Sequence, residues 1–178
     1  QLVLPNASPA ASIHQRIGLT DVTLLYDRPG VNKRKIFGEL IPYGEIWRLG
    51  ANEATRISFS KSIRMASVDI PPGTYALLAV PGETEWIWVL NKDTSLWGTK
   101  GYNAQLDVLR VTAKPESTGE RIETMELRWQ HIRPQSAELI FEWEYLRVRL
   151  PVEFGTDSQV QAELARQLTE KSTGDDFY

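Results

Sequence analysis

The chain has 178 residues, 42% of them hydrophobic and 24% charged, and it contains no cysteine. A chain of this size buries roughly 70% of its unfolded surface, so length and composition exclude a disordered protein and a disulfide scaffold. Its 20 Lys and Arg residues oppose 23 Asp and Glu residues, and the net charge of −3 gives no electrostatic reason to expect nucleic acid as a partner.

The beginning of the sequence bears on where the protein works. The first residue is Gln1 rather than Met, and residues 1–5 lack the basic flank and the long apolar segment of a signal peptide. A cleaved precursor begins in this way, so we expect a processed N-terminus and a periplasmic or secreted location. No apolar run reaches the roughly 20 residues of a membrane-spanning helix, so we expect no membrane span.

Hydrophobic residues recur with a period of two along most of the chain, which predicts strands. Val22, Leu24 and Tyr26 occupy every second position of the first such segment. Further strands are predicted at residues 56–59, 74–80, 85–90, 108–113, 123–129, 137–144 and 146–152. The Pro-Gly-Glu-Thr sequence at 81–84 is typical of a four-residue hairpin loop. Short strands separated by turns predict an all-β fold, either an antiparallel β-sandwich or a jelly-roll-like barrel.

The period changes at the C-terminus, where a short helix is predicted at 156–170. Val160, Leu164 and Leu168 recur four residues apart, and Thr156 or Asp157 can cap the first turn. We expect this narrow apolar stripe to pack against the β core. The polar segment at 171–178 is expected to fray. The whole chain, 1–178, is therefore predicted to be a single domain with its β core at 8–152.

Two irregular segments interrupt the strands. Residues 29–54 contain four glycines, which exclude a long strand or helix, together with many large apolar side chains. They predict a packed connection rather than a floppy loop, and long ordered connections often carry function. A second irregular segment at 91–105 contains Trp97 and Tyr102.

The first of these segments contains the polar residues of greatest interest. Arg48, Asn52 and Glu53 supply a fixed cation, an amide and a carboxylate within six residues, and such a set can clamp a polar ligand. The structural alternative is that Arg48 and Glu53 pair with each other or with the neighbouring strands, and that Asn52 caps its turn. Both readings stay open, and we expect Arg48 to be partly buried at a pocket wall.

A basic cluster precedes this set. Arg28 lies on the same alternating face as Tyr26 and Leu24, so its side chain reaches either the end of the sheet or a polar pocket. In a pocket, its planar guanidinium group would suit a carboxylate or phosphate. Lys33, Arg34 and Lys35 belong to the same cluster, and the alternative for residues 32–35 is a solvated turn tip. Tyr43 lies on the same connection and is a candidate for the pocket lining.

The aromatic residues suggest a carbohydrate ligand, because a flat ring buries the apolar face of a sugar while polar neighbours bind its hydroxyls. Trp47, Trp97 and Tyr102 lie in irregular segments and are the candidates for such a platform. The remaining tryptophans lie in predicted strands, where a core role is expected.

Other chemistry finds little support. His14 and His131 are the only histidines and lie far apart, and the chain lacks a cysteine nucleophile and a phosphate-binding glycine loop, so we expect no metal site and no cofactor. Among the many carboxylates, Glu53 is the candidate for acid or base catalysis, either with Arg48 to stabilise negative charge or paired with the distant Asp107.

Several motifs together resemble a known family. These motifs are Arg28-Pro29-Gly30-Val31, Arg34-Lys35-Ile36-Phe37-Gly38, Ile41-Pro42-Tyr43-Gly44, Trp47-Arg48-Leu49-Gly50-Ala51-Asn52-Glu53-Ala54-Thr55, Pro72-Gly73-Thr74-Tyr75 and Asp107-Val108-Leu109-Arg110-Val111. Residues 8–152 resemble the bacterial family called domain of unknown function 2911. The resemblance implies an exported bacterial protein, and it implies no catalytic residue. The helix after Phe154 lies outside the shared region.

Three functions follow as hypotheses. The first is an exported small-molecule binding module of the bacterial cell envelope, with a carbohydrate or a small anion as ligand. The second is a hydrolase or isomerase that uses Glu53 as acid or base and Arg48 to stabilise negative charge. The third is a structural or interaction subunit that docks a protein partner through sheet edges or the C-terminal helix. The predicted ligand-binding residues are Arg28, Tyr43, Trp47, Arg48, Asn52, Glu53, Trp97 and Tyr102.

Overall fold

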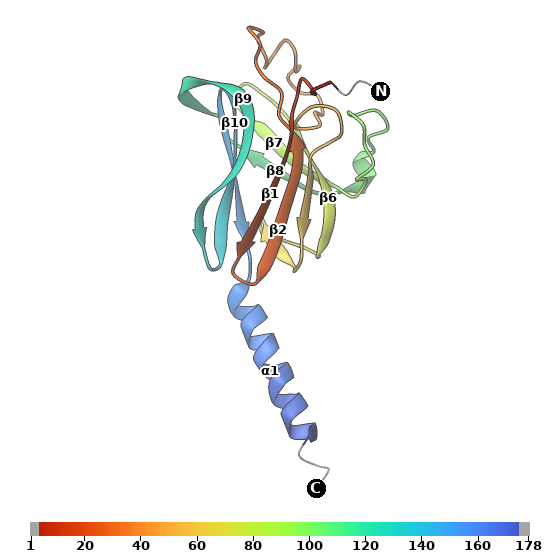
Figure 1. Ribbon diagram of the computed structural model, residues 1–178, viewed down its shortest axis with the longest axis vertical. Coiled ribbons are helices and arrows are strands. Elements are labelled where there is room, and N and C mark those ends of the chain that lie inside the picture. The colour runs from red at the N-terminus through yellow and green to blue at the C-terminus, as the bar shows by residue number, and fades with distance from the viewer. Residues whose placement is uncertain (1–3, 175–178) are drawn as a thin grey trace.

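The alternating segments of the sequence pair into two antiparallel sheets that face each other across one core (Figure 1). The computed structural model describes residues 4–174. The larger sheet has six strands in the order β1-β2-β3-β6-β7-β8: Ala10–Ile17, Thr20–Asp27, Arg56–Phe59, Gly73–Val80, Trp86–Asn91 and Asp107–Ala113. The smaller sheet has four strands in the order β5-β4-β10-β9: Val68–Ile70, Ile63–Met65, Ser136–Glu153 and Glu116–Arg133.

This architecture confirms the predicted all-β antiparallel sandwich, and neither sheet closes into a barrel. The predicted hairpin is also present, since residues 81–85 join β6 to β7. Three strands were not expected, namely β1, β4 and β5. Strands β4 and β5 have three residues each, too few for an alternating pattern to be recognised.

The strand β10 is one long strand where the sequence predicts two. Its pairing with β9 shifts register on both sides of Glu144, which adopts a left-handed backbone conformation with φ 58°. A β-bulge of this kind bends a strand without ending it, but it breaks the alternation that sequence analysis relies on. Glu144 is also tied to the long connection, because its Oε1 accepts a hydrogen bond of 3.4 Å from the Ile36 amide.

Aromatic side chains fill the centre of the core. Trp47 stacks on Trp143 with ring centroids 5.9 Å apart and an interplanar angle of 16°. Phe37, Trp86 and Phe141 contact Trp47 edge-on at centroid distances of 6.1, 6.3 and 5.9 Å. Trp47 itself is only 8% exposed. Its ring therefore belongs to the core and offers no open platform for a sugar, in contrast to the expectation from its place in an irregular segment.

The connection at 28–55 is ordered along its length by pairing with both sheets. The Val31 amide donates to the Glu123 carbonyl (2.8 Å), and the Met125 amide donates to the Pro29 carbonyl (3.0 Å), so the chain leaves β2 and pairs with β9. Trp47 then forms an antiparallel bridge with Ala79, in line with β3. The connection lies at the end of the sandwich opposite the C-terminal helix (Figure 1).

The helix α1 spans Thr156–Gly174 and projects away from the sandwich (Figure 1). Its first turns are anchored to the sandwich: the Thr156 hydroxyl donates to the Pro134 carbonyl, and the Gln159 side-chain amide donates to the Ser62 and Phe154 carbonyls. The apolar stripe does not pack on the core as expected: its residues are 40%, 55% and 69% exposed, namely Val160, Leu164 and Leu168. The helix also extends beyond the predicted end at 170, so residues 171–174 of the predicted frayed tail are helical, and residues 175–178 lie outside the described residues.

Replacing Trp47 with alanine tests how much of the fold depends on the aromatic cluster. Trp47→Ala leaves a cavity among four other rings, so we expect the free energy of unfolding to fall by about 3–5 kcal/mol in a urea titration. Trp97→Ala is the matched control, because its ring is 65% exposed and its loss is expected to cost less than about 1 kcal/mol. Equal destabilisation by the two variants would contradict the central role of Trp47.

Candidate functional site

A tight turn at 48–55 organises the polar end of the sandwich. The Thr55 amide donates to the Arg48 carbonyl (3.1 Å), and the Thr55 hydroxyl donates to the Leu49 carbonyl (2.6 Å), which closes the turn on itself. Gly50 is needed at its start, because a Cβ there would lie 3.0 Å from the Asp27 carbonyl oxygen. The turn is therefore fixed in place against the end of β2.

The second irregular segment packs beside this turn. The Ala54 amide donates to the Leu96 carbonyl (3.0 Å), and the Gly98 amide donates to the Asn52 carbonyl (3.0 Å). Asn52 adopts a left-handed conformation with φ 56°, which asparagine tolerates better than most residues. Apolar residues of both segments cover the outer face of β6 and β7, in a small second core built from Ala54, Ala76, Leu78, Val89 and Leu96.

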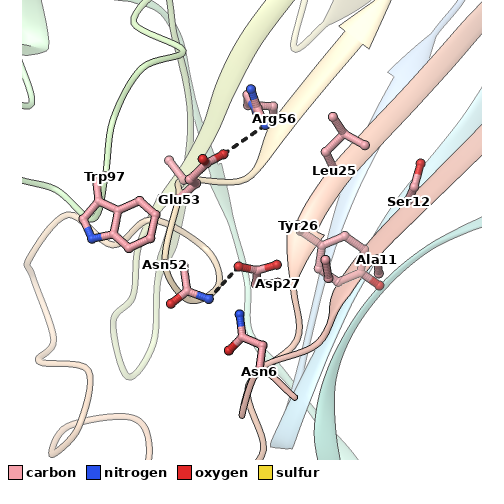
Figure 2. A pocket seen from close by; sticks show the side chains of 12 residues that line it. Asn6, Ala11, Ser12, Leu25, Tyr26, Asp27, Asn52, Glu53, Arg56 and Trp97 are labelled. Carbon is pink, nitrogen blue, oxygen red and sulfur yellow. Dashed lines mark hydrogen bonds and ion pairs between the residues drawn. The ribbon is translucent and has the colours of Figure 1, made fainter. Parts of the chain in front are cut away.

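The turn, the second segment and the ends of β1 and β2 surround a pocket of about 540 Å³, which we call the Trp97 pocket. Figure 2 shows Trp97 on one side, Ser12 and Leu25 on the other, and the polar side chains between them. The pocket is lined by Asn6, Ala10, Ala11, Ser12, Leu25, Tyr26, Asp27, Asn52, Glu53, Ala54, Arg56 and Trp97.

Two polar pairs line the Trp97 pocket (Figure 2). The Asn52 side-chain amide donates to Asp27 Oδ2 at 2.7 Å, and an Arg56 terminal nitrogen lies 3.0 Å from Glu53 Oε2. Glu53 therefore pairs with Arg56, the first residue of the neighbouring strand β3, which is one of the two partners that the structural alternative allowed, and not with Arg48. With Asp27 and Glu53 facing one arginine, the pocket carries a net negative charge.

Trp97 presents its ring to solvent from a fixed backbone. It is 65% exposed, yet its main chain forms an antiparallel bridge with Glu53. A large exposed aromatic ring on an ordered segment is uncommon in a folded protein unless the ring contacts something else.

Tyr102 does not line the Trp97 pocket but anchors the segment that carries Trp97. Its hydroxyl donates to Asp107 Oδ2 (2.6 Å), and that oxygen also accepts from Arg110 Nε (2.9 Å). The other carboxylate oxygen of Asp107 accepts from the side chain of Asn91 (2.7 Å). Burial raises the pKa of the Tyr102 phenol, and its hydrogen bond to Asp107 raises that pKa further. This saturated network leaves Asp107 unsuited to act as a partner for Glu53 in catalysis.

Arg48 lies on the other side of the turn, in a pocket of about 440 Å³ that we call the Arg48 pocket. As expected it is half-buried, and its Nε donates to the Gly50 carbonyl (3.3 Å). The lining residues are Ser8, Pro29, Arg34, Leu40, Ile41, Pro42, Glu45, Ile46, Trp47, Arg48, Gly50, Ala51, Thr99 and Trp143. The two pockets share no lining residue, so Arg48 and Glu53 do not form one site.

Two other predicted site residues line neither pocket. Arg28 donates from Nε to the Met125 carbonyl at 2.9 Å, which ties the end of β2 to β9. The exposed ring of Tyr43 packs over Gly38. Sequence reasoning missed Asp27 and Arg56 in the Trp97 pocket, although both end or begin a strand next to the turn, where polar residues often face a site.

No group of three or more His, Cys, Asp or Glu side chains in residues 4–174 is arranged to hold a metal ion. In the same range, no helix is long and apolar enough to cross a membrane.

The comparisons with known proteins identify the family. The model of the family described as "Protein of unknown function (DUF2911)" matches residues 8–152, and the chain therefore belongs to this family. The matched region runs from just before β1 almost to the end of β10 and leaves α1 outside. No curated protein and no solved structure shows significant similarity to the chain.

The Asp107 network makes a testable contribution to the order of the Trp97 segment. Asp107→Asn turns an amide nitrogen toward groups that donate, so we expect the free energy of unfolding to fall by about 2 kcal/mol and the amides of 92–106 to exchange faster in hydrogen exchange. Asp69→Asn is the control, because it removes the same charge from an exposed pair with Arg64. Unchanged exchange at 92–106 in Asp107→Asn would show that the network does not order the segment.

Proposed function

We propose that this member of the family is a small-molecule binding module and that it holds a carbohydrate in the Trp97 pocket. The proposal depends mainly on one observation: an indole ring that is 65% exposed stands on an ordered segment beside the carboxylates and amide of the same pocket. The chemistry of each group fits a sugar.

The Trp97 ring suits the apolar face of a sugar. Aromatic side chains provide a large apolar area together with a flat surface, and covering that surface releases water from both partners. Because the backbone of Trp97 is paired with that of Glu53, the main chain that carries the ring is already ordered, and binding costs little backbone conformational entropy.

The polar lining supplies acceptors for sugar hydroxyls. Asp27 and Glu53 each use one oxygen in the pairs described above, and Asp27 Oδ1 and Glu53 Oε1 accept no hydrogen bond from the described residues. Arg56 and Asn52 add donors on the same wall. A neutral polyol can satisfy such a mixed set without bringing a charge into the pocket.

The net charge of the Trp97 pocket separates the candidate ligands. Two carboxylates against one guanidinium disfavour a small anion there and leave a neutral sugar favoured. The hydrolase or isomerase hypothesis loses its proposed partner, because Arg48 lines the other pocket. The interaction hypothesis remains as an outcome of the tests below, and the periplasmic or secreted location remains a prediction.

The first test measures binding of neutral sugars. We expect at least one of glucose, galactose, N-acetylglucosamine, cellotetraose, maltotetraose and chitotriose to raise the melting temperature of the wild-type protein and to bind in calorimetry. Trp97→Ala should weaken that binding about tenfold or more, and Trp97→Phe should retain part of it. Tyr145→Ala, which removes another exposed ring, is the control and should bind like the wild type.

Failure of every sugar to bind, or full binding by Trp97→Ala, would contradict the proposal. Capture of a defined protein partner in the absence of sugar binding, lost on deletion of α1, would favour the interaction subunit instead.

Glu53→Gln distinguishes a binding module from an enzyme. The Glu53 side chain is 59% exposed, so the substitution should change the free energy of unfolding by less than about 1 kcal/mol. A binding module should return the bound sugar unchanged in mass spectrometry, and Glu53→Gln should bind it only a few-fold more weakly. A wild-type protein that converts the sugar, with turnover abolished and binding retained in Glu53→Gln, would establish the enzyme hypothesis in its place.

A further inference from the structure

We propose that the Arg48 pocket is a second, separate binding site, and that it takes an oxyanion, a carboxylate or a phosphate, carried on an apolar body. This inference does not depend on the sugar site, because the two pockets share no lining residue. They lie back to back across the 48–55 turn: residues 52–54 line the Trp97 pocket, and Arg48, Gly50 and Ala51 line the Arg48 pocket.

The two arginines of this pocket differ from most arginines in the protein. Within residues 4–174, most arginines lie within ion-pair distance of a carboxylate, and those that do not are Arg28, Arg34, Arg48 and Arg133. Two of these four line the Arg48 pocket. Their positive charge is thus concentrated in one place and is not cancelled by a paired acid.

Backbone carbonyls hold both guanidinium groups in place. Arg48 Nε donates to the Gly50 carbonyl at 3.3 Å. Arg34 donates from Nε to the Val31 carbonyl (3.1 Å) and from a terminal nitrogen to the Gly30 carbonyl (2.7 Å). A carbonyl orients an arginine without neutralising it, and neither terminal nitrogen of Arg48 donates to a described residue. A guanidinium group that is held in a fixed orientation and has no paired acid is suited to bind a carboxylate or phosphate.

One acid lies in the same pocket and limits the excess charge. Glu45 is exposed at the rim and forms no ion pair with a described residue. Two arginines against one glutamate still leave the Arg48 pocket net positive, opposite in sign to the Trp97 pocket.

Ser8 and Thr99 add two hydroxyl groups to the lining, and several apolar side chains lie beside them. The apolar residues include the buried Trp47 and Trp143, and Leu40, which is 47% exposed. Ile41, Pro42 and Ile46 complete the apolar part of the lining. At about 440 Å³ the pocket is within the roughly 300–1,000 Å³ of typical small-molecule sites. The apolar lining predicts that the anionic group is attached to a hydrocarbon or aromatic body, which a bare inorganic ion lacks.

Calorimetric titration with matched probes tests the inference. Phenylacetate and phenyl phosphate carry the two oxyanions on the same ring, and phenylacetamide is the neutral counterpart. We expect at least one of the anions to bind about tenfold or more tightly than the amide, with affinity that falls as salt is raised. Which anion binds better identifies the oxyanion.

Charge variants then locate the site. Arg48→Gln and Arg34→Gln should each weaken binding of the preferred anion about tenfold, whereas Lys33→Gln should change it less than about twofold. Lys33 is the matched control, because it removes the same charge from the position next to Arg34 but does not line the Arg48 pocket. Arg48→Lys keeps the charge and loses the fork, so it should weaken binding less than Arg48→Gln.

Glu45→Gln is expected to increase anion binding, a result that a misfolded protein cannot produce. Removing this rim acid should tighten binding of the anion about threefold, since it removes a repulsive charge from an exposed position. Trp97→Ala should leave anion binding unchanged, which separates this site from the sugar site.

Three results would overturn the inference. They are the absence of binding by both anions at millimolar concentration to folded wild-type protein, equal affinity for phenylacetamide, and equal weakening by Lys33→Gln and Arg48→Gln.

Discussion

Trp47 stacks on Trp143 in the centre of the core, and this contact determines how the polar end of the sandwich is built. Trp143 belongs to β10 of the smaller sheet, whereas the backbone of Trp47 pairs with β6 of the larger sheet. The Trp47 side chain thus holds the connection at 28–55 against the space between the two sheets. Four rings surround Trp47, so its side chain has one well-packed position. Because Arg48 follows directly in the chain, the position of Trp47 also fixes where the turn at 48–55 begins.

The turn at 48–55 acts as a wall between two pockets of opposite charge. Its closure on Thr55 and its pairing with residues 96–98 fix which side chains face each way. Arg48 faces the positive pocket and Glu53 faces the negative one. A single turn can separate charges in this way because left-handed residues, here Leu49 and Asn52, reverse the chain direction over a few residues.

The sequence predicts those features that depend on local pattern. The all-β class, the hairpin at 81–84 and the helix beginning near Thr156 all follow from periodicity and turn chemistry within a few residues. The continuous β10 does not follow, because the bulge at Glu144 interrupts the alternation. The three-residue strands β4 and β5 do not follow either, because they are too short to show an alternation of apolar and polar residues.

The composition of the site is harder to predict, because it depends on contacts between distant segments. Arg48 and Glu53 are close in sequence and were expected to act together, but the path of the turn separates them. Asp27 and Asn52 are 25 residues apart and lie within hydrogen-bond distance. Likewise, nothing within the 29–54 segment shows that Trp47 is buried, since its stacking partner lies in β10. Only the pairing of the sheets decides which aromatic residue is core and which, like Trp97, is left exposed.

The arrangement of the fold also separates its binding end from its helical end. The Trp97 and Arg48 pockets are built by the connection, the second irregular segment and the adjoining strand ends, and almost all of their residues fall in the matched family region 8–152. The helix α1 lies outside that region and leaves the sandwich at the opposite end (Figure 1). Its first turns are anchored to the sandwich, and none of its described side chains lines either pocket. The two ends therefore depend on different contacts: the pockets need the aromatic core, and the helix is held by the carbonyls of Pro134, Ser62 and Phe154.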